Sequence, residues 1–437
     1  MIGVAADSGT RAFDPLVYRA PRPAPWLIHL LGPVNRFLGL GALLRLREID
    51  FPARDRARLR SAVNRNTAAF IGPHHPEFAT DWLLDKEISR VCSPLMAHWA
   101  AWEIVNVNRP AQEFFLRNNL IANTPGGGGR EYSMAWACRG HGVLLHPEGT
   151  ASWHGDHVGR LVPGIVDMAW ETCSRLRGQG VRRPVYLVPI AWKLHFTRDV
   201  GPALAREMSH IERELELAPG HGLAVEQRFA RVLTGVLLRQ RARLGEGLPP
   251  LPADLPPASF FEAQEAFGDA LLERLESRYG RGDGDVGRRQ HALRRAIRGR
   301  MAEDPERARR DRLAVLETER LQAFTRRHYD LPTLTQEQMA ENLKRIRTSL
   351  VVRGLRNTLH NVVPVAVAPR VAHVRVADPI AVHESWTDDP GESERRRAAL
   401  LETHREAIQR ALDSLNRSIA PIVDPYRRRN PMWTGGG

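Results

Sequence analysis

The stretch TAAFIGPHHPEFATDWLLDKEIS, residues 67–89, decides the expected fold. Residues 67–73 are mostly apolar and end in Gly-Pro, which is typical of a buried strand that runs into a turn. Thr80 suits the cap of a helix expected over 80–100, with Asp81 in its first turn. The stretch therefore predicts a strand, a loop that carries two histidines, and a helix.

The same alternation of strand and helix continues along the chain. We expect further strands and helices, with the strands at 119–123, 142–150, 183–192, 362–369 and 372–382 and the helices at 54–65, 130–140, 164–177 and 391–418. Strands that alternate with helices at this spacing predict an α/β fold, layered as helix, sheet and helix around a mostly parallel or mixed sheet.

Residues 201–350 differ in character. Charged helical periodicity dominates there, and Pro/Gly-rich breaks interrupt it at 245–257 and 280–287. We interpret this region as a charged helical insertion, which leaves 51–200 and 351–425 to form the α/β domain. Residues 1–50 are expected to be a loose segment followed by amphipathic helices, and 426–437 a disordered tail.

Composition limits the possible partners. The 437 residues carry a net charge of +13, mostly from arginine, which suits contacts to phosphate and carboxylate groups. An anionic partner is therefore expected: a membrane surface, a phosphorylated substrate, an acidic carrier protein or nucleic acid. Nucleic acid is the least favoured, because no zinc-finger spacing or RNA-binding motif occurs. Three widely spaced cysteines without a CxxC indicate a reducing compartment.

Residues 25–51 are the most apolar part of the chain, but Pro33, Asn35 and Arg36 interrupt them. A membrane-spanning helix needs about twenty apolar residues, so two short amphipathic pieces on a lipid surface are expected instead. The alternative is packing on the protein's own core. The apolar side chains expected at the lipid interface are Trp26, Leu27, Leu30, Leu31, Phe37, Leu38, Leu43 and Leu44.

His75 and Asp81 are the first candidates for chemistry. Proton abstraction from an alcohol near neutral pH requires an imidazole, and a carboxylate can hold that imidazole in one tautomer. A histidine in the loop and an aspartate in the first helical turn can meet in space. His74 is an alternative base and Glu77 an alternative carboxylate.

The second candidate motif is LLHPEGT, residues 144–150. Pro147 stops a strand, Glu148 projects beyond it, Gly149 permits a tight turn and Thr150 offers a hydroxyl. An acid at the carboxyl end of a strand lies where open α/β sheets bind ligands. The alternative is an ordinary turn.

Together, HHPEFATD, HPEGT and YLVPIAW resemble the glycerolipid acyltransferase superfamily, which includes lysophosphatidate and glycerol-3-phosphate acyltransferases. The resemblance covers about 65–195 and extends to VRVADPIAV at 374–382. It implies transfer of a fatty acyl group from a thioester of CoA or acyl carrier protein to a hydroxyl of a lysophospholipid or glycerol phosphate. It also implies that His75 is the general base, that Asp81 orients it, and that Glu148, Gly149 and Thr150 bind the acceptor.

Three departures from the family pattern stand out. Five residues, not four, separate His75 from Asp81, and His146 stands where the family has phenylalanine. The family's phosphate-binding arginine is missing near residue 123. Backbone N–H groups at Gly127 and Gly128 before a helix, with Arg130, are the predicted substitute, and a flexible turn is the alternative. A catalytically inactive membrane-binding scaffold remains the competing function.

No cofactor is expected beyond the acyl thioester as co-substrate. His154, Asp156 and His157 lie close in sequence, but they show no zinc signature, so no metal is expected. The expected partners are the lipid acceptor, the thioester donor and a membrane surface. An acidic acyl carrier protein is an alternative partner for the basic insertion. These features predict a peripheral protein at the cytoplasmic face of the inner membrane.

Overall fold

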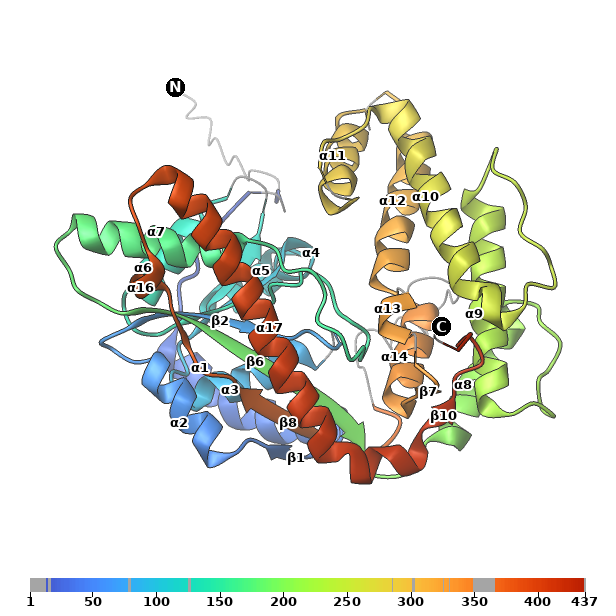
Figure 1. The fold of residues 1–437 in the computed structure, drawn as a ribbon, viewed down its shortest axis with the longest axis horizontal. Coiled ribbons are helices and arrows are strands. Elements are labelled where there is room, and N and C mark those ends of the chain that lie inside the picture. The colour runs from blue at the N-terminus through green and yellow to red at the C-terminus, as the bar shows by residue number, and fades with distance from the viewer. Residues whose placement is uncertain are drawn as a thin grey trace, which may run out of the picture.

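A computed structural model describes residues 13–14, 17–77, 80–124, 127–284, 286–300, 303–324, 326–329, 331–348 and 366–435. Within these residues one eight-stranded sheet forms the centre of the α/β part (Figure 1). Its strands are β1 (Leu46–Asp50), β2 (Ala68–Pro73), β3 (Ala97–Ala101), β4 (Leu120–Asn123), β5 (Val143–Leu144), β6 (Val185–Phe196), β8 (Arg370–Val376) and β9 (Ile380–Ala381).

The sheet is mostly parallel. Its strand order is β1-β8-β6-β2-β5-β3-β4, and β9 pairs with β6 beside this path. Within this sheet, as far as the structure describes it, only the pairs of β6 with β8 and with β9 are antiparallel. The predicted α/β class with a mostly parallel, mixed sheet is therefore confirmed.

Both faces of the sheet are buried. Successive side chains on a strand point to opposite faces, so each strand supplies residues to two apolar cores. On β2, Ala69 and Ile71 enter one apolar core, whereas Ala68 and Phe70 enter the other. The first core is closed by α2 (Ala53–Ala62) and α3 (Asp81–Arg90). The helices on the opposite face are α6 (Gly129–Ala137), α7 (Gly164–Gly178) and the long α17 (Pro390–Val423).

Two of the predicted elements end earlier than expected. The helix expected over 80–100 stops at Arg90, and β3 begins at Ala97, because Pro94 has no N–H to continue a helix. The strand expected over 142–150 is confined to Val143–Leu144. Of the strand expected over 362–369, residues 362–365 lie outside the described residues and 366–369 are not a strand.

The region 201–350 forms a helical lobe beside the sheet (Figure 1). Its described helices are α8 (Gly201–Glu214), α9 (Val225–Leu244), α10 (Phe260–Tyr279), α11 (Val286–Gly299), α12 (Pro305–Ala323), α13 (Arg326–Tyr329) and α14 (Gln336–Ile346). The lobe's apolar core includes Trp153 and Phe196 of the α/β domain. The Glu337 carboxylate of α14 also accepts a bond from the Phe196 N–H, so α14 joins the two parts.

The C-terminal residues correct the expectation of a disordered tail. A short 3-10 turn, Asp424–Tyr426, follows α17, and β10 (Arg428–Arg429) pairs antiparallel with β7 (Thr333–Leu334). Asn430 donates to the carbonyls of Tyr329 and Leu331, and Met432 is buried. The tail is ordered because the insertion, which the sequence reading treated separately, supplies its partners.

The N-terminal segment is only partly as expected. α1 (Pro25–Pro33) and the π-helical η1 (Val34–Leu43) expose Trp26, Leu30, Phe37 and Leu38. Leu44, however, is buried in the domain core, and residues 46–50 form β1. The short helices α4 (Trp102–Val105), α5 (Arg109–Arg117) and α16 (Val382–Ser385) complete the described α/β part. None of the described helices is long and apolar enough to span a bilayer.

Candidate active site

The candidate site lies at the carboxyl ends of β2 and β5, which are adjacent and parallel. The chain leaves β2 at Pro73 and continues into His74 and His75. It leaves β5 at Leu144 and continues into His146 and Glu148. Because parallel strands end at the same edge, these side chains from distant parts of the sequence come together there.

The structure brings His75 and Asp81 together. His75 Nε2 lies 3.0 Å from Asp81 Oδ2, and the other Asp81 oxygen accepts a bond from the Trp82 N–H. The extra residue between His75 and Asp81 is thus absorbed before α3 begins. With Nε2–H donating to the carboxylate, Nδ1 is the basic nitrogen of His75.

A second histidine–carboxylate pair is stacked on the first. His146 Nε2 lies 2.9 Å from Asp85 Oδ2. Asp85 is four residues after Asp81, so both carboxylates project from one face of α3. The rings of His75 and His146 are stacked, with centroids 4.1 Å apart and an interplanar angle of 22°. The two pairs therefore form one compact cluster.

Glu148 holds the histidine loop in place. One of its oxygens accepts from the His75 backbone N–H at 3.0 Å and lies 2.9 Å from His74 Nδ1. Its other oxygen accepts from the Gly159 N–H at 3.0 Å. Glu148, which we expected to bind substrate, thus braces the backbone at His75, and His74 is engaged with Glu148 rather than with Asp81.

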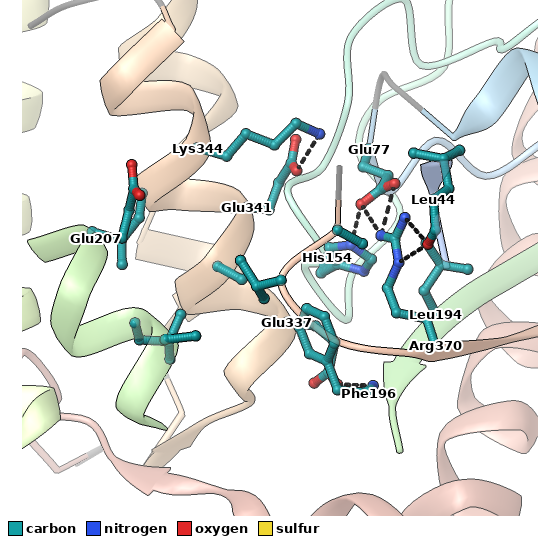
Figure 2. Close-up of a pocket in the computed structure, with 16 residues that line it drawn as sticks. Leu44, Glu77, His154, Leu194, Phe196, Glu207, Glu337, Glu341, Lys344 and Arg370 are labelled. Carbon is teal, nitrogen blue, oxygen red and sulfur yellow. Dashed lines mark hydrogen bonds and ion pairs between the residues drawn. The ribbon is translucent and has the colours of Figure 1, made fainter. Parts of the chain in front are cut away.

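Glu77, the alternative orienting carboxylate, lines a neighbouring pocket (Figure 2). It accepts two bonds from the Arg370 guanidinium, both 3.1 Å, and lies 3.2 Å from His154 Nε2. Lys344 and Glu341 of α14 face it across this pocket. Glu77 is buried and fully engaged, so in this structure it orients neither His74 nor His75.

The loop after Thr150 braces the histidine loop from the side of the helical lobe. The Ser152 N–H donates to the His75 carbonyl, and the His154 N–H donates to the Pro76 carbonyl. Trp153 and His154 both have left-handed backbone conformations, with φ of 53° and 58°. A left-handed backbone conformation strains residues other than glycine, and it persists only where surrounding contacts hold it in place.

Those contacts come from the insertion. The Tyr329 hydroxyl donates to the Trp153 carbonyl at 2.9 Å, Phe324 stacks on the indole, and the Arg345 guanidinium lies 4.8 Å from its ring centre. Arg345 and its neighbour Lys344 also contribute positive charge near His75 and Asp81. The insertion is therefore part of the architecture of the site.

Burial and neighbouring charges shift the acid–base groups. Desolvation and the adjacent His146 lower the pKa of His75 well below its ordinary value. Desolvation raises the pKa of Asp81 to about 7, although His146 and the Trp82 N–H oppose this. Burial also raises the pKa of Glu148, but His74 and two backbone N–H groups outweigh it and bring the pKa to about 2. At neutral pH His75 is thus a neutral imidazole.

The remaining predicted residues lie at different distances from this cluster. Gly149, with φ of 70°, and Thr150 are exposed directly after Glu148. Gly127 and Gly128 follow β4, three strands from β2 and hence about 14 Å away. The Tyr18 ring packs against both glycines, and Arg130 pairs with Glu171 of α7. The structure does not bring the predicted anion nest to His75.

The donor atoms of His75, Asp81 and His146 lie within 4.8 Å of one another, a spacing at which three groups can hold a metal ion. Two ligating imidazoles must each hold the ion in their own ring plane at about 2.0–2.1 Å. The stacked rings have nearly parallel planes, and Nε2 of each faces a carboxylate. The cluster therefore fits proton transfer better than metal binding.

Asp85, Arg370 and Trp153 were missed by the sequence reading. Asp85 could have been found, because the spacing of four from Asp81 places both acids on one helical face. Arg370 and Trp153 carry no comparable local signal, since their partners lie 293 and 176 residues away. Scans against models of protein families and against curated proteins find no match to this chain.

Proposed function

We propose that the protein is an O-acyltransferase that moves a fatty acyl group from a thioester to a hydroxyl of a lysophospholipid or glycerol phosphate. The observation that carries this proposal is the 3.0 Å contact of His75 with Asp81 at the carboxyl edge of the central strands. A neutral, oriented imidazole in this place suits deprotonation of an alcohol.

The reaction needs no covalent enzyme intermediate. The acceptor hydroxyl gives its proton to His75 Nδ1 as its oxygen attacks the thioester carbonyl carbon. The tetrahedral intermediate then collapses, the carbon–sulfur bond breaks, and the leaving thiolate takes the proton from His75. Asp81 stabilises the imidazolium that exists between these two steps, as a carboxylate does in histidine-based acyl transfer.

The lipid-facing part of the proposal is supported by the N-terminal helices. Trp26 and Phe37 are 64% and 75% exposed, which is unusual for such large apolar side chains. An apolar pocket lies between this segment and α3, and Trp82, the residue after Asp81, contributes to its lining. We place the membrane surface at this face and an acyl chain in this pocket.

The test is turnover with a panel of acyl-CoA and acyl carrier protein thioesters and lysophospholipid or glycerol phosphate acceptors. Released thiol and acylated product are both measured. His75→Ala should lower the rate by about 10²–10⁴-fold, the usual contribution of a general base. His221→Ala, an exposed position in the helical lobe, is the matched control and should keep the wild-type rate.

Product that requires both an acceptor and His75 would support the proposal and identify the acceptor. Thiol release that does not depend on an acceptor would indicate a thioesterase instead. No turnover with any pair from folded protein would favour the competing function, an inactive membrane-binding scaffold.

A further inference from the structure

His146 makes contacts that a neutral imidazole cannot satisfy with an ionised carboxylate. Its Nε2 lies 2.9 Å from Asp85 Oδ2, and its Nδ1 lies 3.3 Å from the Pro73 carbonyl oxygen. A carbonyl oxygen and a carboxylate oxygen both accept hydrogen bonds. A neutral imidazole has one N–H, whereas an imidazolium has two and can donate to both acceptors.

The surroundings of His146 are rich in negative charge. Asp85 and Asp81 face it from α3, and Glu148 faces it from its own loop. The nearby groups that oppose a second proton are His75 from the β2 loop, Lys86 from α3 and His98 from β3. Burial of the ring is the largest opposing influence, but Asp85, Asp81 and Glu148 together outweigh it and raise the pKa of His146 above its ordinary value.

His75 lies directly on this ring. Besides His146, the groups facing His75 are Asp81 from α3, Glu148 and His74 from the strand ends, and Arg345 from α14. A positive charge on His146, with ring centroids 4.1 Å apart, penalises a second positive charge on His75. Neither nitrogen of His146 is directed at substrate, because each faces a protein acceptor.

We infer that His146 is a permanent imidazolium that acts as a positioning residue for His75, holding it neutral and oriented so that it can accept a proton. Asp85 acts through His146 by keeping that imidazolium charged. The inference rests on the proposed function for its catalytic meaning, but the protonation states themselves do not depend on which reaction the site performs.

The direct test is nitrogen NMR of protein labelled with ¹⁵N in the histidine rings, titrated from pH 5 to 9. Signals are assigned by their loss in His146→Phe and His75→Ala. We expect both His146 nitrogens to be protonated at pH 7.5, and His75 to have one protonated and one basic nitrogen. A basic nitrogen on His146 at this pH, with the proton on Asp85 instead, would overturn the inference.

A kinetic arm uses His146→Phe, which keeps an aromatic ring against His75, and Asp85→Asn, which keeps the imidazole. Both should move the acidic limb of the kcat/KM profile to higher pH by about one unit or more, so that at pH values below the limb the rate falls about tenfold relative to the wild type. The plateau at high pH should change much less. An unshifted limb in both variants contradicts the inference.

The two arms separate the claims. Wild-type NMR signals as expected, together with no turnover on any thioester, would refute the proposed function and leave the charge state of His146 established. Turnover that needs His75 but does not depend on the charge of His146 would support the proposed function and refute the positioning role of His146. His221→Ala serves as the control in both arms.

Discussion

Ionisation of the Asp81 carboxyl lowers the free energy of unfolding of the protein. This carboxyl has a pKa of about 7 in the folded protein against an ordinary value of 3.8, mainly because it is desolvated. A raised carboxyl pKa is a stability cost that is absent below pH 3.8, grows with pH, and is complete above about 7. The cost falls at the position where the proposed acyl transfer requires an anion beside His75.

We therefore predict that Asp81→Asn stabilises the protein while it impairs turnover. The full pKa shift corresponds to about 4 kcal/mol. The expected gain is smaller, about 1–3 kcal/mol, because asparagine has one acceptor oxygen where the carboxylate uses two. Urea unfolding at pH 5 and pH 8 measures it, and the gain must be larger at pH 8. An equal or smaller gain at pH 8 would contradict the assigned pKa.

The strand β8 shows how one element supports another across the sheet. Arg370, its first residue, is buried and donates to Glu77 in the loop after β2 and to Thr80 at the start of α3. Burial alone would raise the pKa of Glu77, but Arg370, Lys344 and His154 lower it well below its ordinary value. The loop that carries His75 is thus tied to a strand almost three hundred residues away.

Removing one partner of a buried ion pair leaves the other charge uncompensated, which costs about 3–5 kcal/mol. We expect Arg370→Met to destabilise the protein by about that amount, with loss of activity that follows the loss of folded protein. Glu77→Gln combined with Arg370→Met should recover most of the stability, because neither charge of the buried pair remains. Denaturant midpoints of the single and double variants decide this, and a double variant no better than the single one would argue against it.

At the scale of the whole molecule, the exposed apolar face of α1 and η1 and the net charge of +13 both support the proposed partner, an anionic lipid surface. Apolar side chains entering the interface and arginines at the headgroups act together in peripheral binding. The helical lobe contributes α14 to the candidate site, so this site is built from both the α/β domain and the insertion.

Replacing Trp26 and Phe37 together by aspartate should weaken binding to vesicles of mixed zwitterionic and anionic lipid by at least about tenfold, since the side chains lose favourable burial. Leu223→Asp, at an exposed leucine in the helical lobe, is the control. Cosedimentation at low and physiological salt measures the effect. Equal loss in the control, or unchanged binding in the double variant, would place the lipid contact elsewhere.

The local pattern of the sequence was enough for the α/β class, the helical insertion and the closeness of His75 to Asp81, because periodicity, prolines and short spacings act within a few residues. The tertiary structure alone decided which carboxylates His74 and His146 meet. It placed His146 on His75, turned Glu77 toward Arg370, and moved the glycines before α6 to the edge of the sheet. Strand order and long-range ion pairs set these relations. They join residues far apart in the sequence, so no local pattern predicts them.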